Sequence, residues 1–330
     1  MVVMVHFKAT YSGLWIVVIE LFKKISQGDR RALARAISLV ESDDPSGLDV
    51  LRACHPEHCQ SFVIGVTGAP GVGKSTLISQ LTERYLDDDI SVGIIGVDPT
   101  SPFSGGAMLG DRIRMEKHYL DPRVFIRSMA TRDRNVSLPK RVRGIVRLLT
   151  LSGKDIIVVE SVGVGQADLD IQNVVDLVIV VLAPDMGDSI QFLKAGLMEI
   201  ADIFVINKSD HLGLDNMIHD LNEVVDSGND ILLGRSVVVK TQSLNGEGIV
   251  KLKQSIQAYR EVLESSGGLK QKREDQRSVE FFELVFQELK LRLKDDMYND
   301  SIFKSTLQKV KKGDIDPYSA VLTFLERGFN

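Results

Sequence analysis

The sequence predicts an α/β protein whose central sheet is mostly parallel. Short runs rich in β-branched residues recur along the chain, and most are separated by stretches long enough to form a helix. That alternation is typical of strand–helix units whose sheet is covered on both faces. Apolar residues make up 44% and charged residues 26%, and 330 residues suffice for roughly two domains of about 150 residues. The predicted strands are Phe62–Val66, Val92–Val97, Val124–Ile126, Ile156–Val159, Leu177–Leu182, Ile203–Ile206 and Val237–Val239.

An amphipathic helix is predicted before the first strand. Within Ile25–Glu41 four apolar residues recur at helical spacing, and Asp29 stands near the start, where a carboxylate suits the helix dipole. The four are Leu33, Ala36, Ile37 and Val40. Upstream, the apolar run Leu14–Ile19 is shorter than the ~20 residues of a membrane span, and no small-residue cleavage site follows it. We expect a docking helix or an extension there, with an export or membrane-surface segment as the alternative.

The C-terminal part of the chain changes composition after the helix-breaking Ser265–Gly268. A long charged helix is predicted next, with one apolar stripe formed by Phe282, Val285, Leu289 and Leu293. The stripe packs either on its own domain or on a second subunit. We therefore expect three parts: an N-terminal helical extension over residues 1–55, the α/β domain over residues 56–265, and a C-terminal helical arm over residues 266–330.

The charge balance argues against a surface that holds nucleic acid. Forty Lys and Arg against forty-five Asp and Glu give a net charge of −5, so any phosphate must be held locally. Two cysteines cannot build a disulfide framework, which fits a reducing, cytoplasmic compartment. We expect no nucleic-acid partner and no membrane association.

The strongest motif is a complete GxxxxGK[ST] phosphate loop, Gly68–Ser75, directly after the first strand and before a predicted helix. Glycines let the backbone N–H groups point at phosphate oxygens, and the new helix presents its N-terminus. Lys74 supplies a charge to the β- and γ-phosphates, and Ser75 offers a hydroxyl to Mg²⁺. The motif predicts a P-loop NTPase fold. The predicted nucleotide-binding residues are Gly68, Ala69, Gly71, Val72, Gly73, Lys74, Ser75 and Thr76.

A second motif predicts guanine as the base. Asn207-Lys208-Ser209-Asp210 follows the strand Ile203–Ile206, about 130 residues after the P-loop. The Asp210 carboxylate can accept hydrogen bonds from N1–H and the exocyclic amine of guanine, a donor pair that adenine lacks, while the Lys208 stem covers the base. A final base-contacting loop is expected at Thr241, Gln242 and Ser243.

Acidic residues at strand ends predict a metal site. Glu160 ends the strand Ile156–Val159, and Gly163 follows three residues later, the places in P-loop proteins for a carboxylate near Mg²⁺ and an N–H facing the γ-phosphate. Asp98 and Asp111 lie in a glycine-containing stretch that could act as a switch loop, holding Mg²⁺ or orienting water. Position 164 is Val rather than a water-positioning Gln, which predicts slow intrinsic hydrolysis.

Together these motifs resemble the MeaB/ArgK family of GTPases, called the methylmalonic aciduria type A protein in animals. The resemblance rests on GAPGVGKST, VDPTSPFSGGAMLGDRIRM, VVESVGVGQADLD and GDSIQFLKAGLMEIADIFVINKSD, and covers about nine-tenths of the chain. It implies a chaperone that gates cofactor delivery to an adenosylcobalamin-dependent methylmalonyl-CoA mutase, protects it, and dimerises through a C-terminal helical arm. It also implies catalytic or metal-site roles for Lys74, Ser75, Asp98, Asp111 and Glu160, Asp210 on guanine, and switch or partner roles for Arg114, Gln191 and Lys194.

Some features depart from that pattern or stay open. Gln242-Ser243 replaces the usual Ser-Ala, and Ala183–Gly187 differs from the Pro-Gly-rich form that the family pattern implies. The older family label, a kinase of a basic amino-acid (LAO/AO) transport system, is the alternative function, although no acceptor site is recognisable. The cluster Cys54–Cys59 is interpreted as a surface loop, with adventitious metal binding as the alternative. The basic run Lys140–Arg147 is interpreted as a solvated helix face, with anion docking as the alternative.

Overall fold

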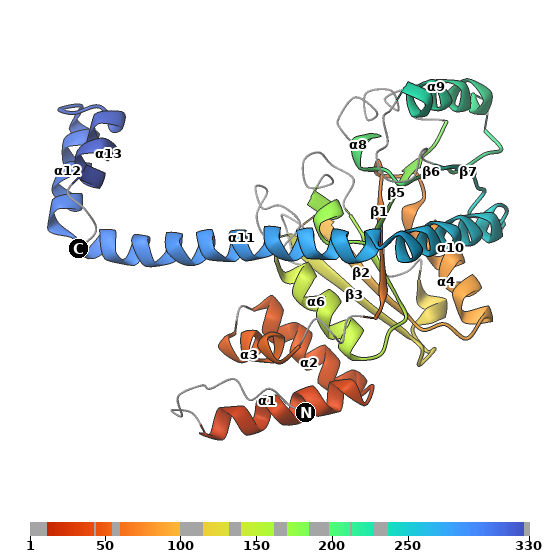
Figure 1. Cartoon of the computed structure of the whole chain (residues 1–330), viewed down its shortest axis with the longest axis horizontal. Coiled ribbons are helices and arrows are strands. Elements are labelled where there is room, and N and C mark those ends of the chain that lie inside the picture. Colours follow the sequence, from red (N-terminus) through yellow and green to blue (C-terminus); the bar gives the residue numbers. More distant parts are fainter. Residues whose placement is uncertain are drawn as a thin grey trace. The chain divides into compact units, whose positions relative to one another are not determined.

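A computed structural model of the chain describes residues 12–42, 44–54, 60–99, 115–131, 140–161, 170–184, 198–211, 213–227 and 237–326 (Figure 1). It divides into two units, Met1–Lys272 and Arg273–Asn330. The first unit holds the sheet and the helices around it, and the second holds most of α11 together with the two last helices.

All seven predicted strands are present and form one sheet in the order β3-β2-β4-β1-β5-β6-β7. Every pairing between these strands is parallel, which confirms the α/β fold class. The longest extension beyond its predicted end is that of β3, which continues to Thr131 because it pairs with β2 residue by residue as far as Pro99. The strands are β1 (Phe62–Thr67), β2 (Val92–Pro99), β3 (Val124–Thr131), β4 (Ile156–Glu160), β5 (Leu177–Leu182), β6 (Ile203–Ile206) and β7 (Val237–Lys240).

Helices cover both faces of this sheet in the first unit. One face packs against α1, α2, α3, α6 and α9, and the other against α4 and α10. Successive side chains of each strand point to opposite faces, so Val63 joins one core while Ile64 joins the other. The bounds are α1 (Ser12–Ser26), α2 (Arg30–Glu41), α3 (Pro45–Ala53), α4 (Lys74–Asp87), η2 (Glu116–His118), α6 (Lys140–Leu151), α8 (Met198–Ile200), α9 (Leu214–Ser227) and α10 (Ile249–Ser266).

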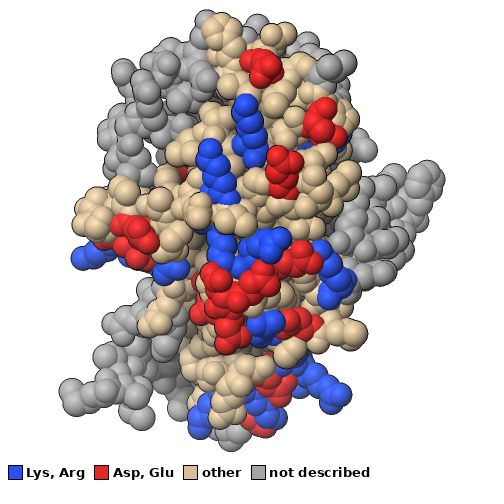
Figure 2. Space-filling model, turned by 90° about the vertical axis from the view of Figure 1, so that its right-hand side faces the viewer, with Lys and Arg blue, Asp and Glu red and all other residues tan. Residues whose placement is uncertain are grey.

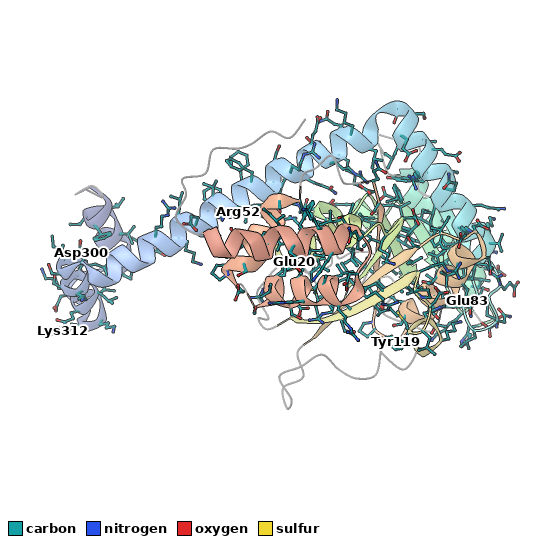
Figure 3. The ribbon with its side chains drawn as sticks, turned by 90° about the horizontal axis from the view of Figure 1, so that it is seen from below. Glu20, Arg52, Glu83, Tyr119, Asp300 and Lys312 are labelled. Atoms are coloured by element: carbon teal, nitrogen blue, oxygen red, sulfur yellow. The ribbon has the colours of Figure 1, made fainter. Side chains whose placement is uncertain are left out.

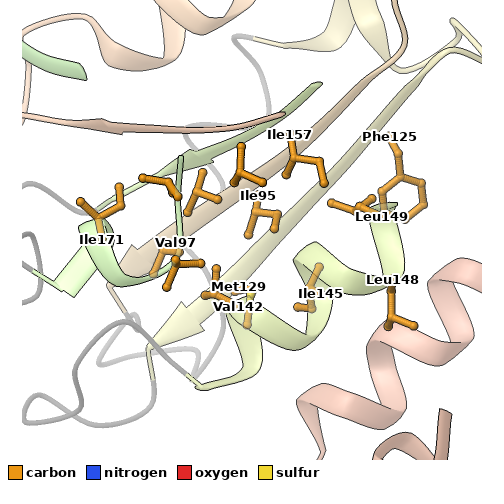
Figure 4. Close-up of a cluster of buried hydrophobic side chains, with 14 of the residues drawn as sticks. Ile95, Val97, Phe125, Met129, Val142, Ile145, Leu148, Leu149, Ile157 and Ile171 are labelled. Carbon is orange, nitrogen blue, oxygen red and sulfur yellow. The ribbon is translucent and has the colours of Figure 1, made fainter. Parts of the chain in front are cut away.

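The core between the sheet and α6 shows how a sequence pattern becomes packing (Figure 4). Val142, Ile145 and Leu149 project from one side of α6 and are fully buried against strand residues such as Ile157. Arg141, Arg143 and Arg147 are partly exposed, and the Nε atom of Arg143 is buried, so the basic side of α6 is less solvated than the sequence predicts. On the side facing α2 and α3, a Cβ on Gly144 would come within 2.9 Å of the Leu51 side chain on α3 and 3.1 Å of Val40 on α2, so this glycine lets the helices pack closely.

The N-terminal helices belong to the same core. Asp29 caps α2 by accepting hydrogen bonds from the backbone N–H groups of Arg31 and Ala32, and the four predicted apolar residues of α2 are all buried. From α1, the buried residues Val18, Leu21 and Ile25 join them, which supports a docking helix. Within the part of the chain that the structure describes, no helix combines the length and the apolar character needed to cross a membrane.

The second unit consists of α11 (Gly268–Asn299, whose first turn lies in the first unit), α12 (Ser301–Lys312) and α13 (Pro317–Glu326). The rings of Phe303 and Phe324 meet edge to face between α12 and α13, with their centroids 5.4 Å apart. On α11 the predicted stripe is largely exposed: Phe282 is 59% exposed and Leu289 is 49% exposed. The side chain of Leu293 lies outside the described residues.

We expect Ile37→Ala in α2 to lower the free energy of unfolding by about 2–5 kcal/mol, because the side chain is fully buried and its removal leaves a cavity. Ile19→Ala is the matched control: it makes the same change in a neighbouring helix where the side chain is 48% exposed, and should cost less than ~1 kcal/mol. Chemical denaturation measures both. Equal effects would show that the N-terminal helices are not part of the core.

Candidate functional site

The predicted motifs meet at one edge of the sheet. The P-loop follows β1, Glu160 ends β4, Asn207 follows β6 and Thr241 follows β7. Because these strands are parallel, their carboxyl ends lie on the same side. β1 stands where the strand order reverses, with β4 on one side and β5 on the other. Ligands of open α/β sheets bind at such a switch point.

The P-loop takes a shape that requires glycine. Gly68, Gly71 and Gly73 have φ values of 137°, 84° and 96°. A Cβ on Gly68 would lie 2.1 Å from the carbonyl oxygen of Val181 on β5. Gly73 precedes α4 and provides no side-chain cap, so the amides of the first helical turn remain for an anion.

Lys74 is held across the start of the loop. Its ammonium donates to the carbonyl oxygens of Gly68 at 2.7 Å and Ala69 at 3.2 Å, and the residue is 7% exposed. These contacts fix the cation over the curl formed by the loop backbone. A buried cation beside the uncapped N-terminus of α4 is suited to hold an anion.

The side chains of Ser75 and Glu160 form a hydrogen bond between α4 and the end of β4. The Ser75 hydroxyl donates to Glu160 Oε1 at 2.9 Å, and both residues are buried. Because that hydroxyl has one proton and two lone pairs, this bond leaves the lone pairs able to face a cation. The backbone of Asp98 lies near the end of β2, two residues beyond Gly96, which pairs with Glu160. Oxygen ligands at neighbouring strand ends fit Mg²⁺, which is bound through few protein oxygens together with phosphate and water.

Asn207 ties the predicted base-binding motif to the P-loop. Its Nδ2 donates to the Val72 carbonyl at 2.7 Å. Its Oδ1 accepts from the Thr241 hydroxyl at 3.1 Å and from Ser243, through the backbone N–H at 3.0 Å and the hydroxyl at 2.8 Å. The residue is 3% exposed. One buried amide therefore connects three loops.

The other residues of the predicted base-binding motif are more exposed. Asp210 has a side chain that is 51% exposed, 3.9 Å from the His211 ring, so its carboxylate can be reached by a ligand. Lys208 adopts a left-handed φ of 56°, unusual for a residue with a side chain. Gln242 forms hydrogen bonds within its own turn. Its side-chain oxygen accepts from the Asn245 amide, and its backbone N–H donates to the carbonyl oxygen of Glu247.

Comparison with known proteins identifies the family of this site. Residues 33–298 match the family model described as methylmalonyl-CoA mutase-associated GTPase MeaB. The chain belongs to the MeaB family. A protein named as a GTPase in Pyrococcus abyssi is 43% identical over 304 residues, covering 91% of this chain and 94% of that protein. GTPase ArgK of Escherichia coli is 32% identical over 315 residues, covering 90% and 92%.

A solved structure confirms the P-loop NTPase fold. The crystal structure of an LAO/AO transport system kinase superposes with a TM-score of 0.70 at 26% identity and covers 94% of this chain and 97% of that one. The predicted family and the predicted GTPase activity are both confirmed by these comparisons. This MeaB-family chain is therefore a P-loop GTPase.

The contact between His118 and Ser79 could not be predicted from any motif in the sequence. His118, in η2, is buried, and its Nε2 lies 3.0 Å from the Ser79 hydroxyl and 3.1 Å from the Ser79 carbonyl on α4. Burial lowers the pKa of the His118 imidazole, which keeps the ring neutral at neutral pH. Lys117 forms an ion pair with Glu83 farther along α4. Figure 3 labels Glu83 on α4 and Tyr119, which follows η2. The turn after the proposed switch stretch is thus fixed to the phosphate-loop helix.

Several predicted residues lie outside the described part of the chain. They are Asp111, Arg114, Gly163, Gln191 and Lys194, together with His55–Cys59 of the cysteine cluster and the side chain of Asp98. Their roles stay predictions. Among the described residues, no group of three or more His, Cys, Asp or Glu side chains gathers closely enough to hold a metal by itself.

We expect Gly68→Ala to weaken GDP binding at least about tenfold, because the added Cβ would push the loop away from Val181 and reshape the phosphate site. Gly28→Ala is the matched control, since Gly28 also has a positive φ of 81° but no atom within 4 Å of its added Cβ. Titration with fluorescent GDP measures affinity, and thermal unfolding reports folding. Unchanged affinity in folded Gly68→Ala protein would contradict this account of the loop.

Proposed function

We propose that this GTPase is a Mg²⁺-dependent chaperone for an adenosylcobalamin-dependent acyl-CoA mutase of the methylmalonyl-CoA mutase type. Its nucleotide state would control loading of the cofactor and protection of the mutase. The observation that carries this proposal is the family match, which spans the P-loop unit and continues to residue 298 of α11. The family description names association with that mutase.

The proposed chemistry at the phosphates is positioning and charge neutralisation. Lys74 and the loop amides would hold the β- and γ-phosphates, and Ser75 would coordinate Mg²⁺ with Glu160 and Asp98 close to it. Bound Mg²⁺ would neutralise charge on the phosphate oxygens. Asp111 and Gly163 complete the proposed set. With Val at position 164, the chain supplies no side chain there to orient water, which favours slow intrinsic hydrolysis.

Guanine would be recognised by the motif that follows β6, at the other end of the nucleotide from the phosphates. The exposed Asp210 carboxylate would accept from N1–H and the 2-amino group, while Lys208 would cover the base. The loop Thr241–Ser243 would line its far side. Arg114, Gln191 and Lys194 are proposed to respond to the nucleotide and to the mutase.

We propose that the GTPase forms a homodimer through its C-terminal helices. Support comes from the second unit, where apolar side chains are exposed on more than one helix, including Phe286 at 67% and Leu322 at 62%. Exposed apolar surface of this extent is typical of an interface. We propose that these C-terminal helices form an arm over residues 266–330, which follows a GTPase domain over residues 56–265 and a helical extension over residues 1–55.

A kinase is the second candidate, favoured by the name of the solved structure, an LAO/AO transport system kinase. The two candidates differ in the fate of the γ-phosphate. A GTPase releases it to water, whereas a kinase transfers it to an acceptor.

With γ-labelled GTP under single-turnover conditions, we expect slow release of the label as free phosphate. Lys74→Ala should reduce that rate by about 10²-fold or more, because the cation on the γ-phosphate is lost. Lys251→Ala, on the exposed side of α10, is the matched control and should leave the rate unchanged. Label on an acceptor protein would favour the kinase, and fast hydrolysis by the isolated protein would overturn the proposal of slow intrinsic turnover.

We expect the full chain to bind an adenosylcobalamin-dependent acyl-CoA mutase with an affinity that differs between GDP and a non-hydrolysable GTP analogue. A chaperone can convert hydrolysis into cofactor transfer only if the two nucleotide states differ in binding free energy. Calorimetric titration against candidate mutases in each state makes the measurement, with Asp210→Ala protein as a nucleotide-binding control. Absence of binding in every state would remove the chaperone proposal and leave the GTPase assignment intact.

A further inference from the structure

Two hydroxyl groups are buried side by side where β1 and β4 end. Ser161 follows Glu160 at the end of β4, and its hydroxyl donates to the Thr67 hydroxyl at 2.8 Å. Thr67 is the last residue of β1 and directly precedes Gly68 of the P-loop. Thr67 is 0% exposed and Ser161 is 3% exposed. This hydrogen bond therefore joins two strands at the points where they enter the candidate site.

The hydroxyl pair lies on the other face of the sheet from the Ser75–Glu160 bond. Val66 of β1 belongs to the core on the α4 side, and Glu160, its partner on β4, bonds to Ser75 of α4 on that side. Thr67 and Ser161 come next along the two chains, and successive side chains of a strand point to opposite faces. The pair therefore acts on the proposed Mg²⁺ ligands through the backbone of β4.

That backbone is held by the same strand. The Ser161 N–H donates to the carbonyl oxygen of Val66 at 3.0 Å, one residue before the hydroxyl partner Thr67. Two bonds to consecutive residues of β1 fix both the place and the direction of the chain at Ser161. Glu160 directly precedes this fixed residue, so the point from which its carboxylate projects toward Ser75 is fixed as well.

Close packing alone does not require hydroxyls at these two positions. Val in place of Thr67 and Ala in place of Ser161 would fill nearly the same volume. Replacing both partners of a buried hydrogen bond by apolar groups of the same shape can be nearly neutral for stability. A hydrogen bond differs from an apolar contact because it sets a distance and an angle. Mg²⁺ demands near-ideal octahedral geometry, so a directional constraint has a use beside its ligands.

We propose that Thr67 and Ser161 are positioning residues for the Mg²⁺ site: their hydrogen bond fixes the end of β4 against β1 and so sets the place of the Glu160 carboxylate relative to the Ser75 hydroxyl. The proposal rests on the proposed Mg²⁺ dependence of this GTPase. Neither hydroxyl is a ligand of the ion. Their loss should therefore weaken the contribution of Mg²⁺ to nucleotide binding and leave binding without the ion unchanged.

The test is the affinity of the full chain for a non-hydrolysable GTP analogue, measured once with Mg²⁺ and once with EDTA. The ratio of the two affinities gives the contribution of the ion. We expect Thr67→Val and Ser161→Ala each to lower this ratio by about fivefold, the size of one net hydrogen bond, with wild-type affinity in EDTA. The double variant should lower the ratio by the same factor as either single variant, because the two hydroxyls act through one bond.

Thr82→Val is the matched control. It makes the same change at a residue that is 1% exposed, whose hydroxyl donates to the Ile78 carbonyl within α4, and it should keep the wild-type ratio. Thr67→Ser and Ser161→Thr keep both hydroxyls and should also keep the ratio. Thermal unfolding verifies that each variant is folded.

An unchanged ratio in folded Thr67→Val and Ser161→Ala would overturn the proposal. Equal weakening with Mg²⁺ and with EDTA would also overturn it, because that result shows a merely structural role in the P-loop. Additive losses in the double variant would contradict a shared bond. If the wild-type ratio is already one, the proposed Mg²⁺ dependence fails and the positioning role fails with it, whereas a wild-type ratio above one that no variant changes removes the positioning role alone.

Discussion

A sheet buried on both faces is the constraint on which the rest of this structure depends. Helices pack against each face, so strand side chains belong to one core or the other and only strand ends remain for polar chemistry. Because the described strands are parallel, four of those ends deliver functional residues to the same edge. The phosphate loop, the Ser75–Glu160 pair and the base motif thus meet although they are far apart in sequence.

Polar side chains at this edge are paired with one another. Ser75 donates to Glu160, and Ser161 at the end of β4 donates to Thr67 at the end of β1, with all four residues buried. In surroundings of low dielectric such bonds hold their groups in fixed directions. A site arranged in this way binds its ligand without reorganising its donors, which is the condition for electrostatic stabilisation of a phosphoryl-transfer transition state.

The sequence predicted those parts of the molecule that depend on local patterns. Strands such as β1 and β5 are continuous apolar runs, and the P-loop glycines are spaced as a phosphate cradle requires. The end of β3 was predicted too early because the chain becomes polar at Arg127 and Ser128, and pairing with β2 overrides that composition. His118 reaches Ser79 across 39 residues, and Ser243 reaches Asn207 across 36. Such contacts depend on tertiary packing, so no spacing rule reveals them.

The net charge of −5 raises the question of how an acidic protein attracts a polyphosphate. On the face shown in Figure 2, positive and negative side chains are interleaved, so that face provides no large field of one sign. Several cations of α4 and α10 are paired locally, as Lys253 is with Asp88 and Arg260 with Glu264. Exposed pairs of this kind are screened beyond about 10 Å and do not steer a ligand from a distance. The groups that can attract phosphate at short range are the loop amides, the N-terminus of α4 and Lys74. Because loop amides act on a phosphate only when they converge on it, the backbone angles of these three glycines matter for an anion site in addition to the lysine charge.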